Sequence, residues 1–397
     1  MRRQLSSIFT ILLVIGFAGC GGGNNSPSPP PPVVNIASGK FLYVANSADA
    51  TVSGFAIAPS GVLTPVPGGN VATYLFVPTG LAVGSAAKVY AGSSVSRDVT
   101  TFSADLKTGQ LSNPLSLPNN FLVGLNHFAG TNATHLVSCG THLFALGETF
   151  GPADGGGTYS VGWGGFAFSL NSDGSIDPYE WSGFGLFDSP PIVSNGFIDP
   201  SCRYIFHANT AEDLAVQTTV DTAAHSGMAY QGYAAGSAPV WVAADPNLKF
   251  LYVANSGSND VSVFSIDVAS GRLTPIAGSP FAAGKQPSSV IVVSSWVYVA
   301  NAGDNTVSAF TWNPTTGALT PVAASPFPVG NTPGEFVSVT TDLSHSSSGM
   351  LLYVANQGSN NVSAFVVDSN GQLRAVAGSP FAVGGQPKGM AVLVAPQ

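Results

Sequence analysis

Glu335 and Lys388 are the residues of this sequence whose types and spacing could support acid–base chemistry on an ester. Each follows a proline closely, in the stretches Pro333-Gly334-Glu335 and Pro387-Lys388. Ester hydrolysis needs a base that activates water and a donor or cation directed at the developing oxyanion. Glu335 could act as that base and Lys388 as the electrophilic cation. The same two side chains could instead form a solvated ion pair, which contributes little stability.

The prolines before Glu335 and Lys388 belong to a set of seven, each followed by two variable residues and an apolar run. Because the position recurs in repeats, we expect the variable pairs to surround one opening. The pairs are Thr79-Gly80, Asn119-Asn120, Pro191-Ile192, Val240-Trp241, Ser288-Ser289, Gly334-Glu335 and Lys388-Gly389. None of the fourteen positions is His or Arg. The candidates for ligand binding are Asn119, Asn120, Trp241, Ser288, Ser289, Glu335 and Lys388.

A glycine-rich stretch, residues 142–163, offers two more side chains that could contact a ligand. Tyr159 and Trp163 present aromatic surfaces for stacking. The glycines disfavour a rigid element, so we expect a loop over the opening. It could act as a lid or recognition loop, or it could be a neutral surface insertion, which long loops tolerate.

The elements that position these residues are repeats of an apolar strand with the sequence Tyr-Val-Ala-Asn, whose tyrosine a Phe follows twelve residues later. The tyrosines are Tyr43, Tyr252, Tyr298 and Tyr353. Degenerate copies fit at Tyr90, at Phe206 and, most weakly, at residues 136–139. Tyr252 and Tyr298 are 46 residues apart (252 to 298), a period typical of propeller blades.

The repeats predict an all-β fold, a seven-bladed β-propeller of four-stranded antiparallel blades. Residues 389–394 read as a strand with no tyrosine strand after them, while the first repeat, at Lys40, has no such strand before it. We therefore expect the C-terminal strand to pair with the N-terminal blade and close the ring. Closure removes the exposed strand edges that favour aggregation.

The Tyr-Val-Ala-Asn strands and the Ser-Pro-Phe endings of the repeats resemble the YVTN-type, 6-phosphogluconolactonase-like propeller family. The resemblance is close in repeats one, five, six and seven and loose in two to four. It implies the propeller fold and, for some members, hydrolysis of sugar lactones, whereas other members are noncatalytic exported proteins. In the lactonase members, His and Arg commonly occupy the channel mouth.

Because this sequence places neither His nor Arg at the predicted mouth, we favour a binding or interaction scaffold over an enzyme. Its channel mouth would face a protein or small-molecule partner. The alternative is a lactonase-like hydrolase that uses Glu335 and Lys388, and a third possibility is a structural protein of the cell surface.

The N-terminal residues 1–19 are predicted to be an export signal, because Arg2 and Arg3 precede an apolar segment too short to span a bilayer. The ending Phe17-Ala18-Gly19-Cys20 resembles the lipobox of bacterial lipoproteins, which implies lipidation of Cys20. Residues 20–37, rich in Gly, Ser and Pro, read as a disordered tether, and residues 38–397 as the propeller. We expect a protein anchored by lipid to the bacterial cell envelope, in the periplasm or at the cell surface.

The composition of the sequence limits the classes of partner that the protein could bind. The net charge is −8 and only 8% of residues are charged, so no basic stripe exists to bind nucleic acid. The histidines lack the spacing of a metal site, and we predict no metal, no cofactor and a monomer. Cys139 and Cys202 lie on adjacent blades and could form a disulfide in an oxidising compartment, or could lie too far apart to do so.

Overall fold

The computed structural model describes residues 39–73, 77–95, 98–118, 130–152, 158–185, 195–220, 230–340 and 349–395. The chain divides into two units, Met1–Asn35 and Ile36–Gln397, and every described residue lies in the second. The predicted export signal, Cys20 and the whole of the predicted tether therefore lie outside the described residues. Within the described ranges, no helix is long and apolar enough to cross a membrane.

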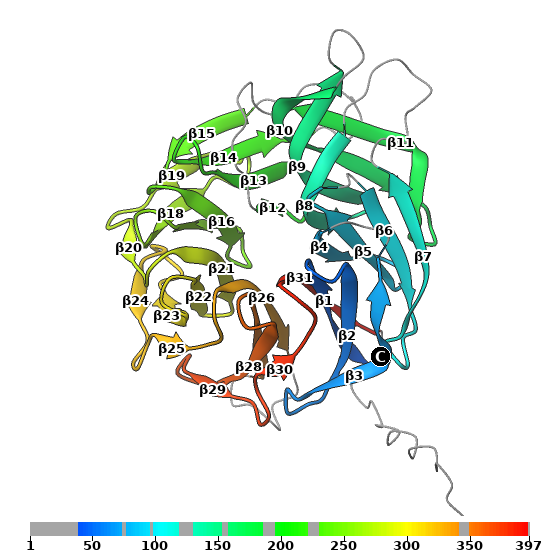
Figure 1. Ribbon diagram of the computed structural model, residues 1–397. Coiled ribbons are helices and arrows are strands. Elements are labelled where there is room, and N and C mark those ends of the chain that lie inside the picture. The colour runs from blue at the N-terminus through cyan, green and yellow to red at the C-terminus, as the bar shows by residue number, and fades with distance from the viewer. Residues whose placement is uncertain are drawn as a thin grey trace, which may run out of the picture. The chain divides into compact units, whose positions relative to one another are not determined.

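Seven antiparallel sheets surround a central opening (Figure 1), which confirms the predicted all-β, seven-bladed propeller. We number the blades in chain order and give the strands of each from the innermost outwards. Blade 1 consists of β31 (Pro387–Val394), β1 (Lys40–Asn46), β2 (Thr51–Ile57) and β3 (Leu63–Ala72). Blade 2 consists of β4 (Pro78–Val83), β5 (Lys88–Ser93), β6 (Asp98–Ala104) and β7 (Leu111–Pro118).

The third and fourth blades depart most from the repeat in length. Blade 3 consists of β8 (Gly130–Cys139), β9 (His142–Pro152), β10 (Thr158–Leu170) and β11 (Ile176–Gly185). Blade 4 consists of β12 (Gly196–Ile198), β13 (Tyr204–Asn209), β14 (Leu214–Thr219) and β15 (Tyr230–Ala234).

In the last three blades the outermost strand is in two pieces that pair with the same neighbour. Blade 5 consists of β16 (Pro239–Ala244), β17 (Phe250–Asn255), β18 (Asp260–Ile266), β19 (Leu273–Pro275) and β20 (Phe281–Ala282). Blade 6 consists of β21 (Pro287–Val293), β22 (Trp296–Asn301), β23 (Thr306–Trp312), β24 (Leu319–Pro321) and β25 (Phe327–Pro328). Blade 7 consists of β26 (Pro333–Thr340), β27 (Met350–Asn356), β28 (Asn361–Val367), β29 (Leu373–Ala375) and β30 (Phe381–Ala382).

The Ser-Pro-Phe endings of the repeats explain how the outermost strand is interrupted without loss of backbone hydrogen bonds. Between β19 and β20, the Ser279 hydroxyl accepts a hydrogen bond from the Val263 N–H at 2.8 Å. Ser325 and Ser379 do the same for the Ala309 and Ala364 N–H groups, each at 2.9 Å. The serine thus replaces the carbonyl that a continuous strand would supply.

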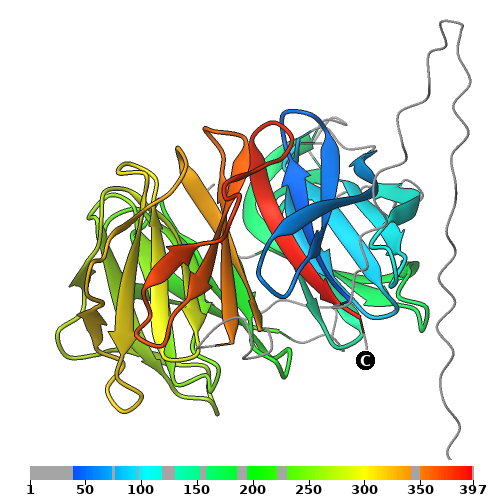
Figure 2. The same cartoon turned by 90° about the horizontal axis from the view of Figure 1, so that it is seen from below.

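The ring closes as predicted, through pairing of β31 with β1 (Figure 2). Val44 lies opposite Met390 and Leu42 opposite Val392. The C-terminal strand therefore completes the first blade and pairs with the edge of β1 that would otherwise face the channel unpaired.

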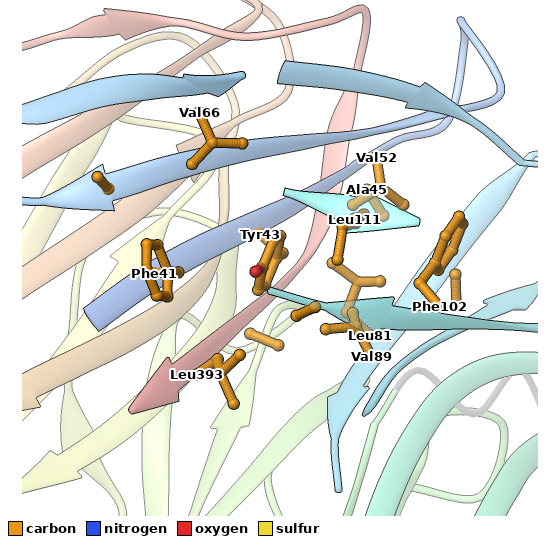
Figure 3. Close-up of a cluster of buried hydrophobic side chains, with 14 residues drawn as sticks. Phe41, Tyr43, Ala45, Val52, Val66, Leu81, Val89, Phe102, Leu111 and Leu393 are labelled. Carbon is orange, nitrogen blue, oxygen red and sulfur yellow. The ribbon is translucent and has the colours of Figure 1, made fainter. Parts of the chain in front are cut away.

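The Tyr-Val-Ala-Asn strand is buried on both faces because each blade packs against two neighbours. Phe41 and Tyr43 of β1 pack against blade 2 (Figure 3), whereas the alternating residues Leu42 and Val44 pack against blade 7. Seven such hydrophobic clusters occur among the described residues, one between each pair of neighbouring blades. A continuous apolar run in the sequence is therefore the signature of a blade-to-blade contact.

In blades 1, 2, 5, 6 and 7 the repeated tyrosine links its blade to the next one through a glycine carbonyl. Tyr353 of blade 7 donates a hydrogen bond to the Gly61 carbonyl of blade 1 at 2.9 Å, across the closure. Tyr298 donates to Gly371 at 3.0 Å, and Tyr252 to Gly317 at 3.4 Å. These glycines have φ values of 89°, 78° and 76°, a conformation that favours glycine.

We expect the Tyr353→Phe substitution to destabilise the propeller by about 1–3 kcal/mol, because the buried Gly61 carbonyl loses its donor. The same substitution at Tyr252 removes a longer hydrogen bond and should cost less. Urea unfolding of the two variants checks this order. Equal losses would mean that the phenol rings alone, through packing, determine the effect.

The asparagine that ends the strand holds the following turn in place. Its side-chain amide donates to two oxygens of the next strand: Asn255 Nδ2 lies 2.7 Å from Asp260 Oδ1 and 2.9 Å from Ser262 Oγ. Asn46, Asn301 and Asn356 make the equivalent contacts in their blades. The four residues of the motif are thus explained by burial, an interblade hydrogen bond and a turn.

Candidate functional site

A cavity of about 480 Å³ runs between the innermost strands of all seven blades. Most of its lining is apolar, from residues such as Leu81, Val242 and Ile291. The polar side chains of the lining are His135, Ser138, Asn195, Trp241 and Glu335. A concave, mainly apolar space with a few convergent polar groups is the usual form of a small-molecule site, and its volume falls within the roughly 300–1,000 Å³ typical of such sites.

Four of these polar residues occupy the same position in their blades. In each innermost strand, one residue pairs with the repeated aromatic residue, as Ala243 does with Tyr252 and Val137 with Phe144. The position two residues earlier, on the same face of the strand, forms what we call the channel ring. The channel ring consists of Gly80, His135, Asn195, Trp241, Ser289, Glu335 and Gly389.

The two glycines of the channel ring allow blades 1, 2 and 3 to approach closely. A Cβ on Gly389 would lie 2.3 Å from the Thr79 carbonyl oxygen, and one on Gly80 would lie 3.0 Å from the Cα of His135. Blades 1 and 2 lie between blade 7, which carries Glu335, and blade 3, which carries His135. Because the ring residues of these two blades are glycines, neither places a ring side chain between Glu335 and His135. The functional groups are gathered on the remaining arc, on blades 3, 4, 5 and 7.

The presence of His135 in the channel ring corrects the sequence analysis, which found no histidine at the mouth. Residues 136–139 were predicted to be the third repeat's copy of the tyrosine strand, but they lie in β8, the innermost strand. The tyrosine strand's counterpart is β9, in which Phe144 takes the place of the tyrosine. The predicted mouth residues Asn119 and Asn120 lie outside the described residues.

His135 is held as a neutral imidazole. The side chain of His135 is half-buried in the cavity. The loss of hydration lowers its pKa to about 4, while a hydrogen bond to the Gly196 backbone acts in the opposite direction. The Asn195 side-chain nitrogen lies 3.4 Å from both ring nitrogens. The Trp241 ring contacts the imidazole edge-on, with centroids 5.9 Å apart. At neutral pH His135 therefore keeps a ring nitrogen that can accept a proton.

Glu335 is held as a neutral carboxylic acid. Its surroundings raise its pKa to about 8, because burial penalises the carboxylate more than a hydrogen bond from the Met390 N–H favours it. That hydrogen bond ends on Oε2 at 3.0 Å. With Oε2 accepting from the backbone, the acid proton is carried by Oε1, which is left to donate into the cavity.

Comparison with protein-family models gives a match over part of the chain. Residues 197–390 match the family model described as Lactonase, 7-bladed beta-propeller. The chain is a lactonase-like seven-bladed propeller. None of the curated proteins searched matches this chain.

Solved structures of similar fold include bacterial proteins with lactonase names. A candidate 6-phosphogluconolactonase from Bacteroides uniformis has a TM-score of 0.69 at 18% identity, and the match covers 89% of this chain and 99% of that one. The periplasmic gluconolactonase of Pseudomonas aeruginosa has a TM-score of 0.68, also at 18% identity, with 90% and 99% covered. At this identity the likeness to the solved structures concerns the fold alone.

Three other predicted site residues, Ser288, Ser289 and Lys388, lie outside the cavity lining. Ser288 donates to the Pro333 carbonyl at 2.6 Å, and Ser289, although a ring residue, is buried and donates to the Gly334 carbonyl. Both serines thus bind the backbone of blade 7. Lys388 is half-buried on β31, next to the ring residue Gly389, and does not line the cavity. Glu335 accepts a hydrogen bond from the Met390 N–H, in place of the ion pair with Lys388 that the sequence suggested.

Tyr159 and Trp163 lie on a strand rather than in the predicted loop. Tyr159 pairs with Gly151 and Trp163 with Glu148 in the β9–β10 ladder, whose register shifts between Ser160 and Gly162. Glycines disfavour strands only weakly, and the pairing of β9 with β8 on one side and with β10 on the other offsets that cost. β8 begins at Gly130, before the ring residue His135, and Gly130 pairs with Phe150 of β9. These strands therefore extend beyond the channel ring, at the end of the blade where the innermost strand begins.

Cys139 and Cys202 form a disulfide, with Cα atoms 5.9 Å apart. The sequence analysis did not decide whether this bond forms. It ties the end of β8 to the turn before β13 and so fixes blade 3, which carries His135, against blade 4, which carries Asn195. Disulfides are typical of proteins that leave the reducing cytosol.

Proposed function

We propose that this propeller hydrolyses a sugar lactone in its central cavity. The neutral imidazole of His135 accepts the proton of the attacking water, and the protonated Glu335 donates a hydrogen bond to the lactone carbonyl oxygen. The bond between the carbonyl carbon and the ring oxygen then breaks, and the ring oxygen takes up the proton to give the open hydroxy acid.

The observation that carries this proposal is the pair of opposite pKa shifts in one cavity. Loss of hydration keeps His135 unprotonated at neutral pH, so that a ring nitrogen is free to accept, and keeps Glu335 protonated, so that it can donate a hydrogen bond. Pairs of titratable groups whose surroundings push their pKa values apart are characteristic of acid–base sites. The family match over residues 197–390, which include Glu335, favours the same reaction class.

The hydrolase is preferred to the binding scaffold that the sequence analysis put first. That preference depended on the lack of a histidine at the channel mouth, and His135 removes its basis. A scaffold also gives no reason for two half-buried titratable groups whose surroundings disfavour their charged forms.

Turnover of D-glucono-δ-lactone by the full-length protein tests the proposal. We expect a rate above spontaneous hydrolysis that saturates with substrate, measured as acid release at pH 7. A control with Lys388→Gln should retain the rate, because Lys388 does not line the cavity. A rate equal to the spontaneous one, for this lactone and for a wider panel of aldonolactones, would refute the proposal.

A further inference from the structure

The cavity offers no positive charge to a substrate. None of the described Lys or Arg residues lines it. Lys388, the cation on the ring strand β31 itself, is half-buried and does not line the cavity. The side chain of Lys285, which precedes the ring strand β21, is 77% exposed, and its Nζ lies 3.9 Å from Asp304. His135 and Glu335 are both neutral near pH 7, so the channel ring is uncharged. The chain as a whole carries a net charge of −8, which opposes the approach of an anion.

The same lining suits a neutral sugar. Trp241 is half-buried at the channel ring and presents an apolar ring to the cavity, the kind of surface that packs against the C–H face of a sugar. Asn195, only 4% exposed, lines the cavity and has no hydrogen-bond partner for its Oδ1 among the described residues. A buried acceptor without a partner costs free energy, which a substrate hydroxyl would recover.

We infer that the lactone taken by this cavity is an uncharged aldonolactone and not a sugar-phosphate lactone. This inference rests on the proposed hydrolase function and specifies its substrate class. A phosphate group carries up to two negative charges, and its transfer from water into this cavity would find no Lys, Arg or other cation to compensate for lost hydration. Two structural neighbours are candidate 6-phosphogluconolactonases, but at 18% identity they show the fold alone and leave the substrate open.

The test compares D-glucono-δ-lactone with its 6-phosphate as substrates of the full-length protein at pH 7. We expect kcat/KM to be higher for the neutral lactone by about 10²-fold, the scale of discrimination that an uncompensated buried charge provides. Equal values, or a preference for the phosphorylated lactone, would overturn the inference and leave the proposed function intact. Turnover of neither lactone would instead overturn the proposed function.

Binding of the two reaction products decides the substrate class even without turnover. In calorimetry, gluconate should bind more tightly than 6-phosphogluconate, since the two differ only in the phosphate. Tighter binding of the phosphorylated product would contradict the inference.

A substitution in the lining provides a positive control. Ala244 lines the cavity on β16. We expect Ala244→Lys to shift the kcat/KM ratio towards the phosphorylated lactone by at least about tenfold, as a buried cation compensates the phosphate. Ala244→Gln, of similar bulk but uncharged, should leave the ratio unchanged, and thermal melting of both variants checks that they fold. If both variants shift the ratio equally, shape and not charge determines selectivity, and the inference fails.

Discussion

Replacing His135 with glutamine is expected to lower kcat for D-glucono-δ-lactone by about 10²–10⁴-fold, the usual contribution of a positioned acid or base. Glutamine keeps a polar side chain of similar size between Asn195 and Trp241 but cannot take a proton from water. KM should change little, because the substitution removes a contact that matters mainly in the transition state. Initial rates at pH 7, corrected for spontaneous hydrolysis, measure the effect.

Two controls separate loss of a proton acceptor from loss of structure. The His135→Gln variant should unfold at nearly the same urea concentration as the parent, since His135 belongs to none of the hydrophobic interblade clusters and glutamine can keep a polar contact with Asn195. Lys388→Gln, on the innermost strand of blade 1, should keep the parental rate. Retention of most of the activity in His135→Gln would mean that another group activates water.

The fold could be predicted from the sequence because its determinants are local and recur. The tyrosine of each repeat is buried between two blades and donates to a glycine carbonyl in the next one, as Tyr298 does to Gly371. The asparagine three residues later fixes a turn within its own blade, as Asn255 does. The residues that determine the fold of a blade and its contact with the next blade therefore lie within the repeat. Four close copies of the repeat were enough to predict the ring of blades.

The site could be predicted only where the repeat is regular. Trp241 and Glu335 follow their prolines at the expected spacing and line the cavity. Blades 3 and 4 have lost that spacing, so the prediction passed over His135 and Asn195. A signal was present in the aromatic residue: Phe144 pairs with Val137 seven residues earlier, as Tyr298 does with Ile291, and His135 stands two residues before Val137.

The protonation states could not be derived from the sequence. They depend on how closely seven strands approach, which Gly80 and Gly389 allow through contacts distant along the chain. The same glutamate at a wider opening would be hydrated and ionised. The sequence analysis accordingly treated Glu335 as ionised, either as a base or as an ion-pair partner, whereas in the structure its pKa is raised to about 8 and the neutral acid predominates at pH 7.

The dependence of kcat/KM on pH should be bell-shaped, with a plateau between about pH 4 and about pH 8. Catalysis requires neutral His135, whose pKa is lowered to about 4, so activity is lost as the pH falls through that value. It also requires protonated Glu335, whose pKa is raised to about 8, so activity is lost as the pH rises through that value. Because kcat/KM reports the free enzyme, these limbs correspond to the unliganded cavity.

Substitutions at Glu335 distinguish a donor from a base. Glutamine can accept from the Met390 N–H through its carbonyl and donate into the cavity through its amide, as the neutral acid does. We therefore expect Glu335→Gln to retain activity within about tenfold and to lose the alkaline limb while keeping the acid limb. Glu335→Ala, which lacks a donor, should lose about 10²–10³-fold, the scale for removal of one oxyanion donor. If Glu335 were the base, glutamine would abolish turnover and the parental rate would rise through pH 8.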